Sequence, residues 1–290
     1  MSRSLAPQSC LLRTAALGLL GAFLALGVSA QTFQYPTNCK ITSDGQLDNS
    51  ATIATPLLVD QDFRSETLTD SYAISSATAF NVNDVKGSFA EVFRNSFGGG
   101  GCVSEISASI ADQVSWSLVG DTSSMTVFID SLSVESVSID RQNITGAGVP
   151  ITASSTYEVP QAQQLLLEIP FEVTGNTKRR LVVDPFAFSR TDTASTTGSS
   201  VGAYQVFADN NKNCTVDAGD SSNIGSKGIV GPNSTFSEPP TSYSITPGRY
   251  VLSIAYFTDV DLAAFSADCL SSPSSSGWHN DGFDLVLTLF

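Results

Sequence analysis

A stretch of twelve residues, DNNKNCTVDAGD at 209–220, spaces oxygen-bearing side chains in a way that suits a metal ion. These side chains stand at positions 1, 3, 5, 9 and 12 of the stretch: Asp209, Asn211, Asn213, Asp217 and Asp220. A hard cation such as Ca2+ takes six to eight oxygen ligands, and an EF-hand-type loop supplies them at this spacing. Thr215, at position 7, would contribute its backbone carbonyl, and the aliphatic Val216 at position 8 would anchor the loop in the core. The sequence therefore predicts a calcium site.

Two positions depart from the usual pattern of such a loop. Position 6 normally holds glycine because the chain turns sharply there, and this chain has Cys214. A positive φ at Cys214 would cost on the order of 1 kcal/mol, and a disulfide could hold that turn in place. Position 12 is Asp220 instead of Glu, which shortens its reach. We expect weak binding, in the roughly 0.1–1 mM class of extracellular modules. The alternative is an Asn- and Asp-rich turn that binds nothing.

The loop resembles the calcium loops of dockerins and of the serine–aspartate-repeat B modules of bacterial surface proteins. In those loops, phrases similar to DxNxNxxxDxGD follow a strand or open a turn. The resemblance covers about 12–20 residues of the 290, and the chain shows no cohesin-binding pair of dockerin repeats. It implies a β-sandwich of the kind found in extracellular stalks and matrices.

The rest of the sequence has the pattern of strands. Apolar and polar residues alternate from Gln113 to Leu118, as in a strand with one buried face. Stronger apolar runs occur at 164–173, 181–188, 249–257 and 283–290. The best candidate for a helix is Ser88 to Phe97. We predict an all-β fold, a β-sandwich with two sandwich-like domains that follows a cleaved signal peptide.

The predicted signal peptide covers residues 1–30. Arg3 and Arg13 give it a positive start, an apolar run follows from Thr14 to Val28, and small residues precede a cut at Gln31. The run is short for a membrane span, although an uncleaved anchor is the alternative. No second apolar stretch is long enough to span a membrane, so we predict no transmembrane segment in the mature chain. The predicted location is secreted, periplasmic or at the cell surface.

The predicted domains are an N-terminal β-sandwich at 31–190 and a C-terminal β domain with the calcium loop at 203–290. The Ser- and Thr-rich run at 191–202 would be a linker or long loop. Without the leader, four cysteines remain: Cys39, Cys102, Cys214 and Cys269. An even number in an exported chain predicts two disulfides, and three pairings are possible. We favour Cys39–Cys102 with Cys214–Cys269, because each pair stays within one predicted domain.

The net charge of −14 argues against nucleic acid as a partner and is compatible with divalent cations. The candidate partners are glycans or other surface proteins, and the oligomeric state stays open. The only histidine, His279, lies in a predicted surface loop, and no GxSxG motif precedes it, so a serine nucleophile is not expected. Glu168 is expected to be solvated on an edge strand. Trp116 alternates with apolar residues and is expected in the core, whereas Trp278 is the better exposed aromatic.

These observations lead to two hypotheses about function. The first is a non-enzymatic, calcium-stabilised exported protein with a structural, surface or adhesive role. The alternative is a carbohydrate-binding or carbohydrate-cleaving protein of the same fold. An exposed aromatic strip near Trp278, or two carboxylates that face each other in a cleft, would favour the alternative.

Overall fold

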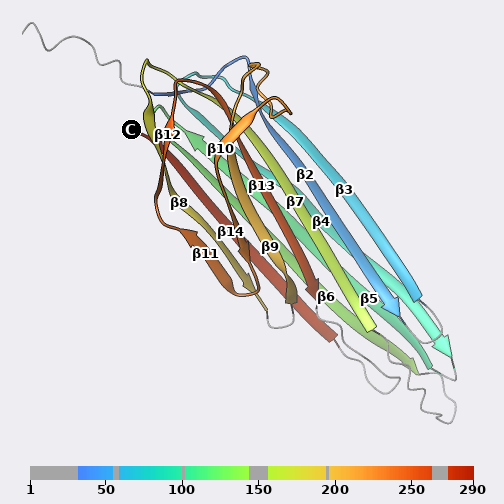
Figure 1. Cartoon of the computed structure of the whole chain (residues 1–290). Helices are drawn as coiled ribbons and strands as arrows, with labels where there is room; N and C mark the ends of the chain where they lie inside the picture. The colour runs from blue at the N-terminus through green and yellow to red at the C-terminus, as the bar shows by residue number, and fades with distance from the viewer. Residues whose placement is uncertain (1–31, 55–58, 100–101, 144–155, 194–195, 263–273) are drawn as a thin grey trace, which may run out of the picture.

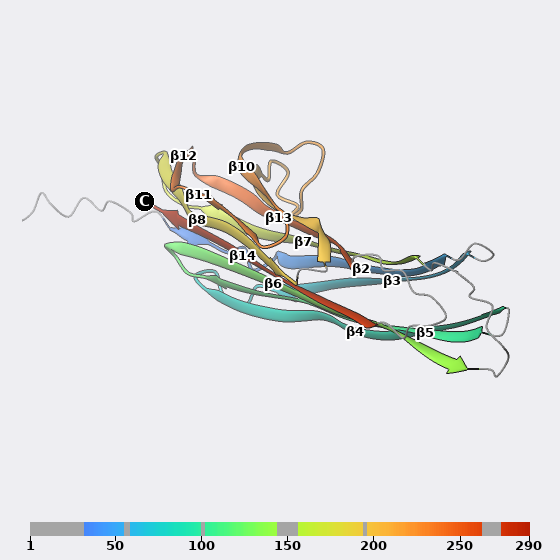
Figure 2. The same ribbon diagram turned by 90° about the horizontal axis from the view of Figure 1, so that it is seen from below.

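Two antiparallel β-sheets make up the described part of the chain, and they pack face to face (Figures 1 and 2). The computed structural model describes residues 32–54, 59–99, 102–143, 156–193, 196–262 and 274–290. None of these residues is helical, so the prediction of an all-β fold is confirmed. The predicted signal peptide at 1–30 lies outside the described residues.

The first sheet has the strand order β10-β9-β13-β7-β2-β3, and the short β1 also pairs with β7. Every pairing within it is antiparallel. Its strands are β1 (Phe33–Gln34), β2 (Lys40–Ala54), β3 (Val59–Ala73), β7 (Thr156–Val173), β9 (Thr196–Ala208), β10 (Ser221–Val230) and β13 (Gly248–Leu262).

The second sheet has the order β11-β8-β14-β6-β5-β4, and β12 also pairs with β8. Its pairings are antiparallel as well. Its strands are β4 (Phe80–Gly99), β5 (Cys102–Gly120), β6 (Ser124–Asn143), β8 (Arg179–Asp192), β11 (Ser234–Glu238), β12 (Thr241–Ile245) and β14 (Ser274–Leu289).

The alternation in the sequence builds the core directly, because successive side chains of a strand point to opposite faces of the sheet. In β6, Met125, Val127 and Ile129 are buried, while Phe128 between them is exposed. The apolar runs predicted as strands lie in β7, β8, β13 and β14. Trp116 of β5 is buried in the core, as predicted.

The strand assignments correct two predictions. The segment proposed as a helix, Ser88 to Phe97, lies within β4. The predicted linker at 191–202 overlaps the end of β8 and the start of β9. Both sheets combine strands from the 31–190 and 203–290 parts of the chain: β13 pairs with β7 in the first, and β14 with β6 in the second. The two predicted domains therefore share both sheets.

Aromatic side chains join the two sheets. Phe186 of the second sheet meets Tyr204 of the first edge to face, with ring centroids 5.0 Å apart. Phe188 meets Tyr256 in the same way at 6.1 Å. Edge-to-face pairs of this kind stabilise a core beyond the area that they bury. At Gly202, a Cβ atom would lie only 2.7 Å from a ring carbon of Phe283, so the sheets approach too closely there for a side chain.

Gly202 gives a direct test of this close approach. We expect Gly202→Ala to lower the free energy of unfolding by about 1–3 kcal/mol, because Phe283 is fully buried and has no room to move. The matched control is Gly231→Ala, since nothing lies within 4 Å of a Cβ at that position. Urea denaturation of both variants measures the difference. Equal stability of the two variants would contradict the packing described here.

Candidate functional site

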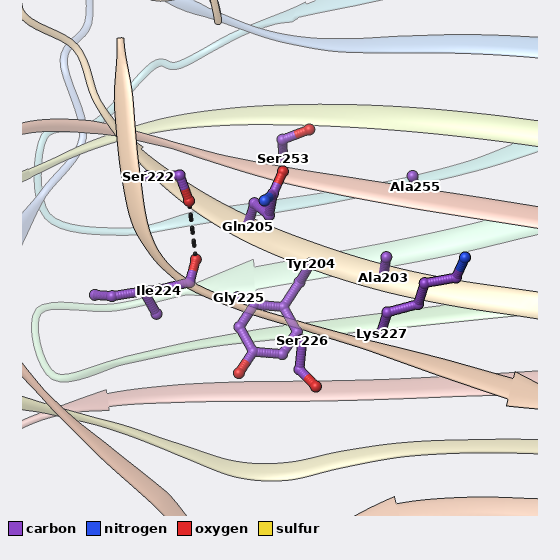
Figure 3. A pocket seen from close by; sticks show the side chains of 10 residues that line it. All are labelled: Ala203, Tyr204, Gln205, Ser222, Ile224, Gly225, Ser226, Lys227, Ser253 and Ala255. Carbon is purple, nitrogen blue, oxygen red and sulfur yellow. Dashed lines mark hydrogen bonds between the residues drawn. The ribbon is translucent and has the colours of Figure 1, made fainter.

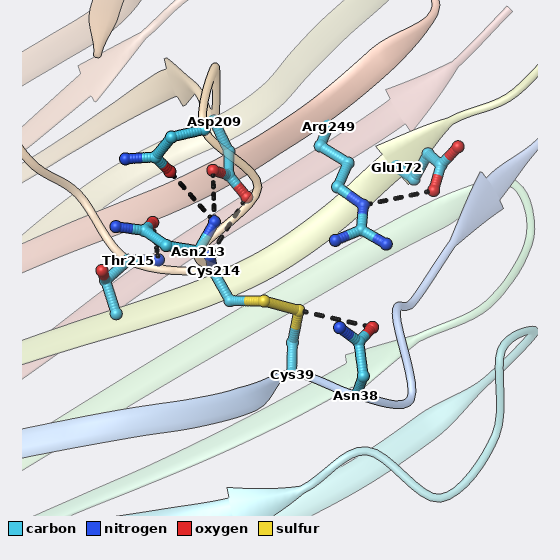
Figure 4. Close-up of a disulfide and its surroundings, with 9 residues drawn as sticks. Asn38, Cys39, Glu172, Asp209, Asn213, Cys214, Thr215 and Arg249 are labelled. Carbon is cyan, nitrogen blue, oxygen red and sulfur yellow. Dashed lines mark hydrogen bonds and ion pairs between the residues drawn. A yellow bond between two sulfur atoms is a disulfide. The ribbon is translucent and has the colours of Figure 1, made fainter. Parts of the chain in front are cut away.

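The predicted calcium loop, 209–220, connects β9 to β10 and is fastened to the first sheet at three points. The amide of Asp209 donates to the carbonyl of Arg249 on β13, over 3.0 Å. Cys214 forms a disulfide with Cys39, which directly precedes β2 (Figure 4). The backbone N–H of Val216 donates to the carboxylate of Glu168 on β7. A segment of irregular structure is thus held against three neighbouring strands.

The Cys39–Cys214 disulfide corrects the predicted pairing. We had favoured Cys39–Cys102 and Cys214–Cys269 because we placed each pair in its own domain, but the sheets join the two parts of the chain. The bonded cysteines are 175 residues apart in the sequence, and their Cα atoms are 5.7 Å apart. The side chain of Cys102 and the whole of Cys269 lie outside the described residues.

The backbone at Cys214 has the conformation that its loop position demands. Its φ is 72°, in the left-handed region that normally favours glycine, and Lys212 has a φ of 60°. Such a conformation costs a non-glycine residue on the order of 1 kcal/mol. The half-buried Cys214 packs against the hydrophobic core through its disulfide. This covalent and apolar anchoring offsets the cost, as the sequence had suggested.

Asp209 organises the first half of the loop. It is almost fully buried, and its two carboxylate oxygens accept the backbone N–H groups of Asn213 and Cys214 over 3.0 and 3.1 Å. Hydrogen bonds from backbone amides to a carboxylate are among the stronger ones in proteins. The carboxylate at position 1 therefore fixes the backbone at positions 5 and 6 (Figure 4).

The side chains at positions 3, 5 and 9 converge. The amide groups of Asn211 and Asn213 both donate to Oδ2 of Asp217, Asn213 over 3.0 Å. Oδ1 of Asp217 accepts the backbone N–H of Gly219 over 2.8 Å. This backbone bond, helped by Asn211 and Asn213, lowers the pKa of Asp217. The carboxylate at position 9 is thus held in its charged form at the centre of the loop.

Asp220 and Thr215 complete the predicted set. Oδ1 of Asp220 accepts the backbone N–H of Asn210 over 3.2 Å, and Oδ2 accepts that of Asp217 over 3.1 Å. The amide of Thr215 donates to Oδ1 of Asn213 over 3.1 Å. Across the described residues, no group of three or more His, Cys, Asp or Glu side chains is arranged to hold a metal ion. The side chains of Asn211 and Asn213 present amide nitrogen towards Asp217.

Two expectations about residues near the loop were wrong. Val216 was expected to reach the core, but it is only half-buried and contacts Glu168 through its backbone. Glu168 was expected on a solvated edge strand, but β7 lies inside the first sheet, between β13 and β2. Partial burial raises the pKa of Glu168, and the bond from Val216 opposes that rise.

A second polar group lies between the two sheets, where the inward faces of five strands change from apolar to polar. We call it the buried polar layer; it consists of Ser131, Arg190, Asp192, Ser200, Thr258, His279 and Asp281. The guanidinium of Arg190 binds both carboxylate oxygens of Asp192, with Nη2 2.7 Å from Oδ1, and both side chains are fully buried. A buried ion pair of this kind needs further hydrogen bonds to offset its desolvation.

Those further bonds cross from one sheet to the other. Nη1 of Arg190 donates to the hydroxyl of Ser200 and to the carbonyl of Asp259, each over 3.2 Å. The hydroxyl of Tyr256 in the first sheet donates to Oδ2 of Asp281 in the second over 2.7 Å. Burial raises the pKa of Asp281, and the bond from Tyr256 opposes that rise. The buried polar layer thus fixes the register between the sheets.

His279 corrects the prediction of a surface histidine. It lies in β14, opposite Asp192 of β8, and is fully buried. Neither ring nitrogen has a hydrogen-bond partner among the described residues. Desolvation and the nearby charge of Arg190 lower its pKa to about 4. The sequence did carry a signal for this burial. His279 and Asp281 occupy the same every-second-residue positions as Phe283, Leu285 and Leu287, so all five side chains point to the same, buried face of the strand.

A shallow hollow of about 560 Å³ lies on the outer face of the first sheet (Figure 3). It crosses β9, β10 and β13, and its walls are short or neutral side chains such as Ala203, Gln205 and Ser253. Lys227 is the one cationic residue among those that line it. Tyr204 and Lys227 are the titratable residues among those that line it, and burial raises the pKa of Tyr204.

The comparisons with known proteins give no family assignment. A scan against models of protein families finds no match for the chain, and neither does a search of curated proteins. The described part of the chain has no helix of the length and hydrophobicity that crossing a membrane requires. The assignment of function therefore depends on the geometry of the chain itself.

The disulfide leads to a prediction about stability. Because it closes a loop of 175 residues, we expect the double variant Cys39→Ser and Cys214→Ser to lose about 3–5 kcal/mol of unfolding free energy. Peptide mapping without reductant should recover the two cysteines in one linked peptide pair. A linked pair of Cys39 and Cys102, or a double variant as stable as the wild type, would contradict the assignment.

The buried His279 predicts a loss of stability in mild acid. Its folded pKa of about 4 lies below the ordinary histidine value of 6.5, so between these two values the unfolded chain binds a proton that the folded chain does not bind. The stabilisation is complete above pH 6.5 and falls as the pH drops towards 4. Between pH 7 and pH 5 the loss is about 2 kcal/mol. Urea titrations of the wild type and His279→Leu measure it: the variant should show a smaller loss. The same acid sensitivity in both would refute this role.

Proposed function

We propose that this protein is an exported, calcium-stabilised β-sandwich protein with a structural, surface or adhesive role. The observation that carries the proposal is the convergence of Asn211 and Asn213 on Asp217, in a loop whose backbone Asp209 already holds in the turn. The spacing, the positive φ at position 6 and the carboxylate at position 9 are features of an EF-hand-type calcium loop.

The residues present fit calcium in part. The side-chain oxygens of Asp209, Asn211, Asn213, Asp217 and Asp220 and the backbone carbonyl of Thr215 would be the ligands. To present oxygen instead of nitrogen towards Asp217, the amide groups of Asn211 and Asn213 would have to turn over. Such a rotation exchanges two groups of similar shape, and it gives up the bonds that the two amide oxygens accept from the backbone N–H groups of Asn213 and Thr215. When bound, calcium would neutralise the carboxylates of the loop and so remove their mutual repulsion.

Export is supported by the leader at 1–30 and by the disulfide, since disulfides persist in oxidising compartments. A structural role is supported by how the loop is attached. Asp209, Cys214 and Val216 fasten it to strands β13, β2 and β7, so an ion held in the loop would stabilise the centre of the first sheet. The net charge of −14 suits a surface that meets divalent cations.

Calcium should therefore raise the melting temperature. With a dissociation constant of roughly 0.1–1 mM, 10 mM calcium stabilises the folded chain by about 1.4–2.7 kcal/mol, which corresponds to several degrees. We expect Asp217→Asn to abolish the rise, whereas Asp130→Asn, which removes an exposed carboxylate from the other sheet, should keep it. Differential scanning calorimetry with calcium, and with chelator, makes the measurement. Identical melting of the wild type in both buffers would mean that the loop is an empty turn.

A further inference from the structure

The outward face of the second sheet carries exposed apolar side chains in an ordered arrangement. We define the outer strip as Phe128, Asp130 and Leu132 of β6 together with Trp278, Asn280 and Asp284 of β14. Phe128, Leu132 and Trp278 are exposed by 43%, 39% and 41%. These residues alternate with buried ones along β6 and β14, so they face away from the first sheet.

The strand register arranges the outer strip as a line. Asn280 stands opposite Leu132, and Asp284 opposite Phe128. From Trp278 to Asp284, six residues of extended strand cover about 20 Å. Aromatic rings therefore mark both ends of the line, while Asn280 and Asp130 place amide and carboxylate groups between them.

The middle of the outer strip is open. Gly282, opposite Asp130 on one side and Ser189 on the other, has no side chain. A Cβ there would lie 3.2 Å from the hydroxyl of Ser189 and 3.9 Å from Oδ1 of Asp130. A ligand that lies along the strip can thus reach a hydroxyl and a carboxylate at its centre. The burial of Asp284 and the nearby charge of Asp130 raise the pKa of Asp284.

We propose that the outer strip binds a neutral, extended glycan. Flat faces of sugar rings stack on aromatic side chains, and sugar hydroxyls donate to carboxylate and amide oxygens. Such a ligand matches the line of aromatic, polar and aromatic groups along β6 and β14.

The charge of the strip selects among ligands. Asp130 and Asp284 repel anionic polymers, and no Lys or Arg takes an outward position between the registers of Trp278 and Asp284 on the described β6, β8 and β14. A protein partner fits less well, because polar residues separate the apolar side chains, whereas protein interfaces have a contiguous apolar centre. The strip does not depend on the calcium loop, which is attached to the other sheet.

Native affinity electrophoresis tests the proposal on the purified chain. The gels contain hydroxyethylcellulose, laminarin or galactomannan as neutral polymers, and alginate as an anionic one. We expect at least one neutral polymer to retard the protein and alginate not to do so. Trp278→Ala should weaken that retardation about tenfold. The matched control, Ile229→Ala, removes an exposed apolar side chain from β10 of the first sheet and should leave binding unchanged.

Further measurements separate the other outcomes. The melting temperature of Trp278→Ala should equal that of the wild type, and chelator should not alter the retardation. Absence of retardation by every neutral polymer, or equal retardation of Trp278→Ala, overturns the proposal, as does preference for alginate. Sedimentation equilibrium tests whether a second copy of the chain binds the strip instead of a glycan. A dimer that Trp278→Ala dissociates would show that the strip is an interface between two copies of the chain.

Discussion

Burial of the two inward sheet faces against each other is the interaction on which the other features of this protein depend. An antiparallel sheet buries one face and leaves the other to solvent, so each strand alternates apolar and polar residues. Phe186 and Phe188 of one sheet meet Tyr204 and Tyr256 of the other, and Gly202 lets the layers approach closely. The outward faces are then free to carry the loop at 209–220 on one sheet and the outer strip on the other.

The same packing constrains the buried polar layer. A buried ion pair within one strand gains little stability on its own, because desolvation opposes the attraction of the charges. Arg190 and Asp192 are nevertheless fully buried, with Ser200 and the carbonyl of Asp259 supplying bonds from the opposite sheet. Such bonds form in only one relative position of the sheets, so they specify that position. The same layer buries the ring of His279 without a hydrogen-bond partner among the described residues. The lowered pKa of that ring makes the stability of the fold sensitive to acid.

Local pattern in the sequence predicted the strands well and their partners poorly. Alternation around Trp116 and the apolar runs identified β5, β7, β8, β13 and β14, because side-chain periodicity is a local property. Strand order is set by contacts between distant segments, such as β2 with β7, and no local pattern reports it. That is why the domain boundary and the cysteine pairing were misplaced. His279 was predicted at the surface because it was placed in a loop, although its position in an alternating run indicated the core.

The candidate site shows how a long-range contact completes a local one. The sequence alone shows the spacing of oxygen-bearing side chains from Asp209 to Asp220. It also predicts a positive φ at Cys214, which the structure has. What holds Cys214 in that conformation is Cys39, 175 residues away and beside β2. Because β2 neighbours β7, whose Glu168 bonds the loop at Val216, both ties converge on the same part of the first sheet. The loop is therefore held by the sandwich itself, which lowers the entropy that an ion would have to offset.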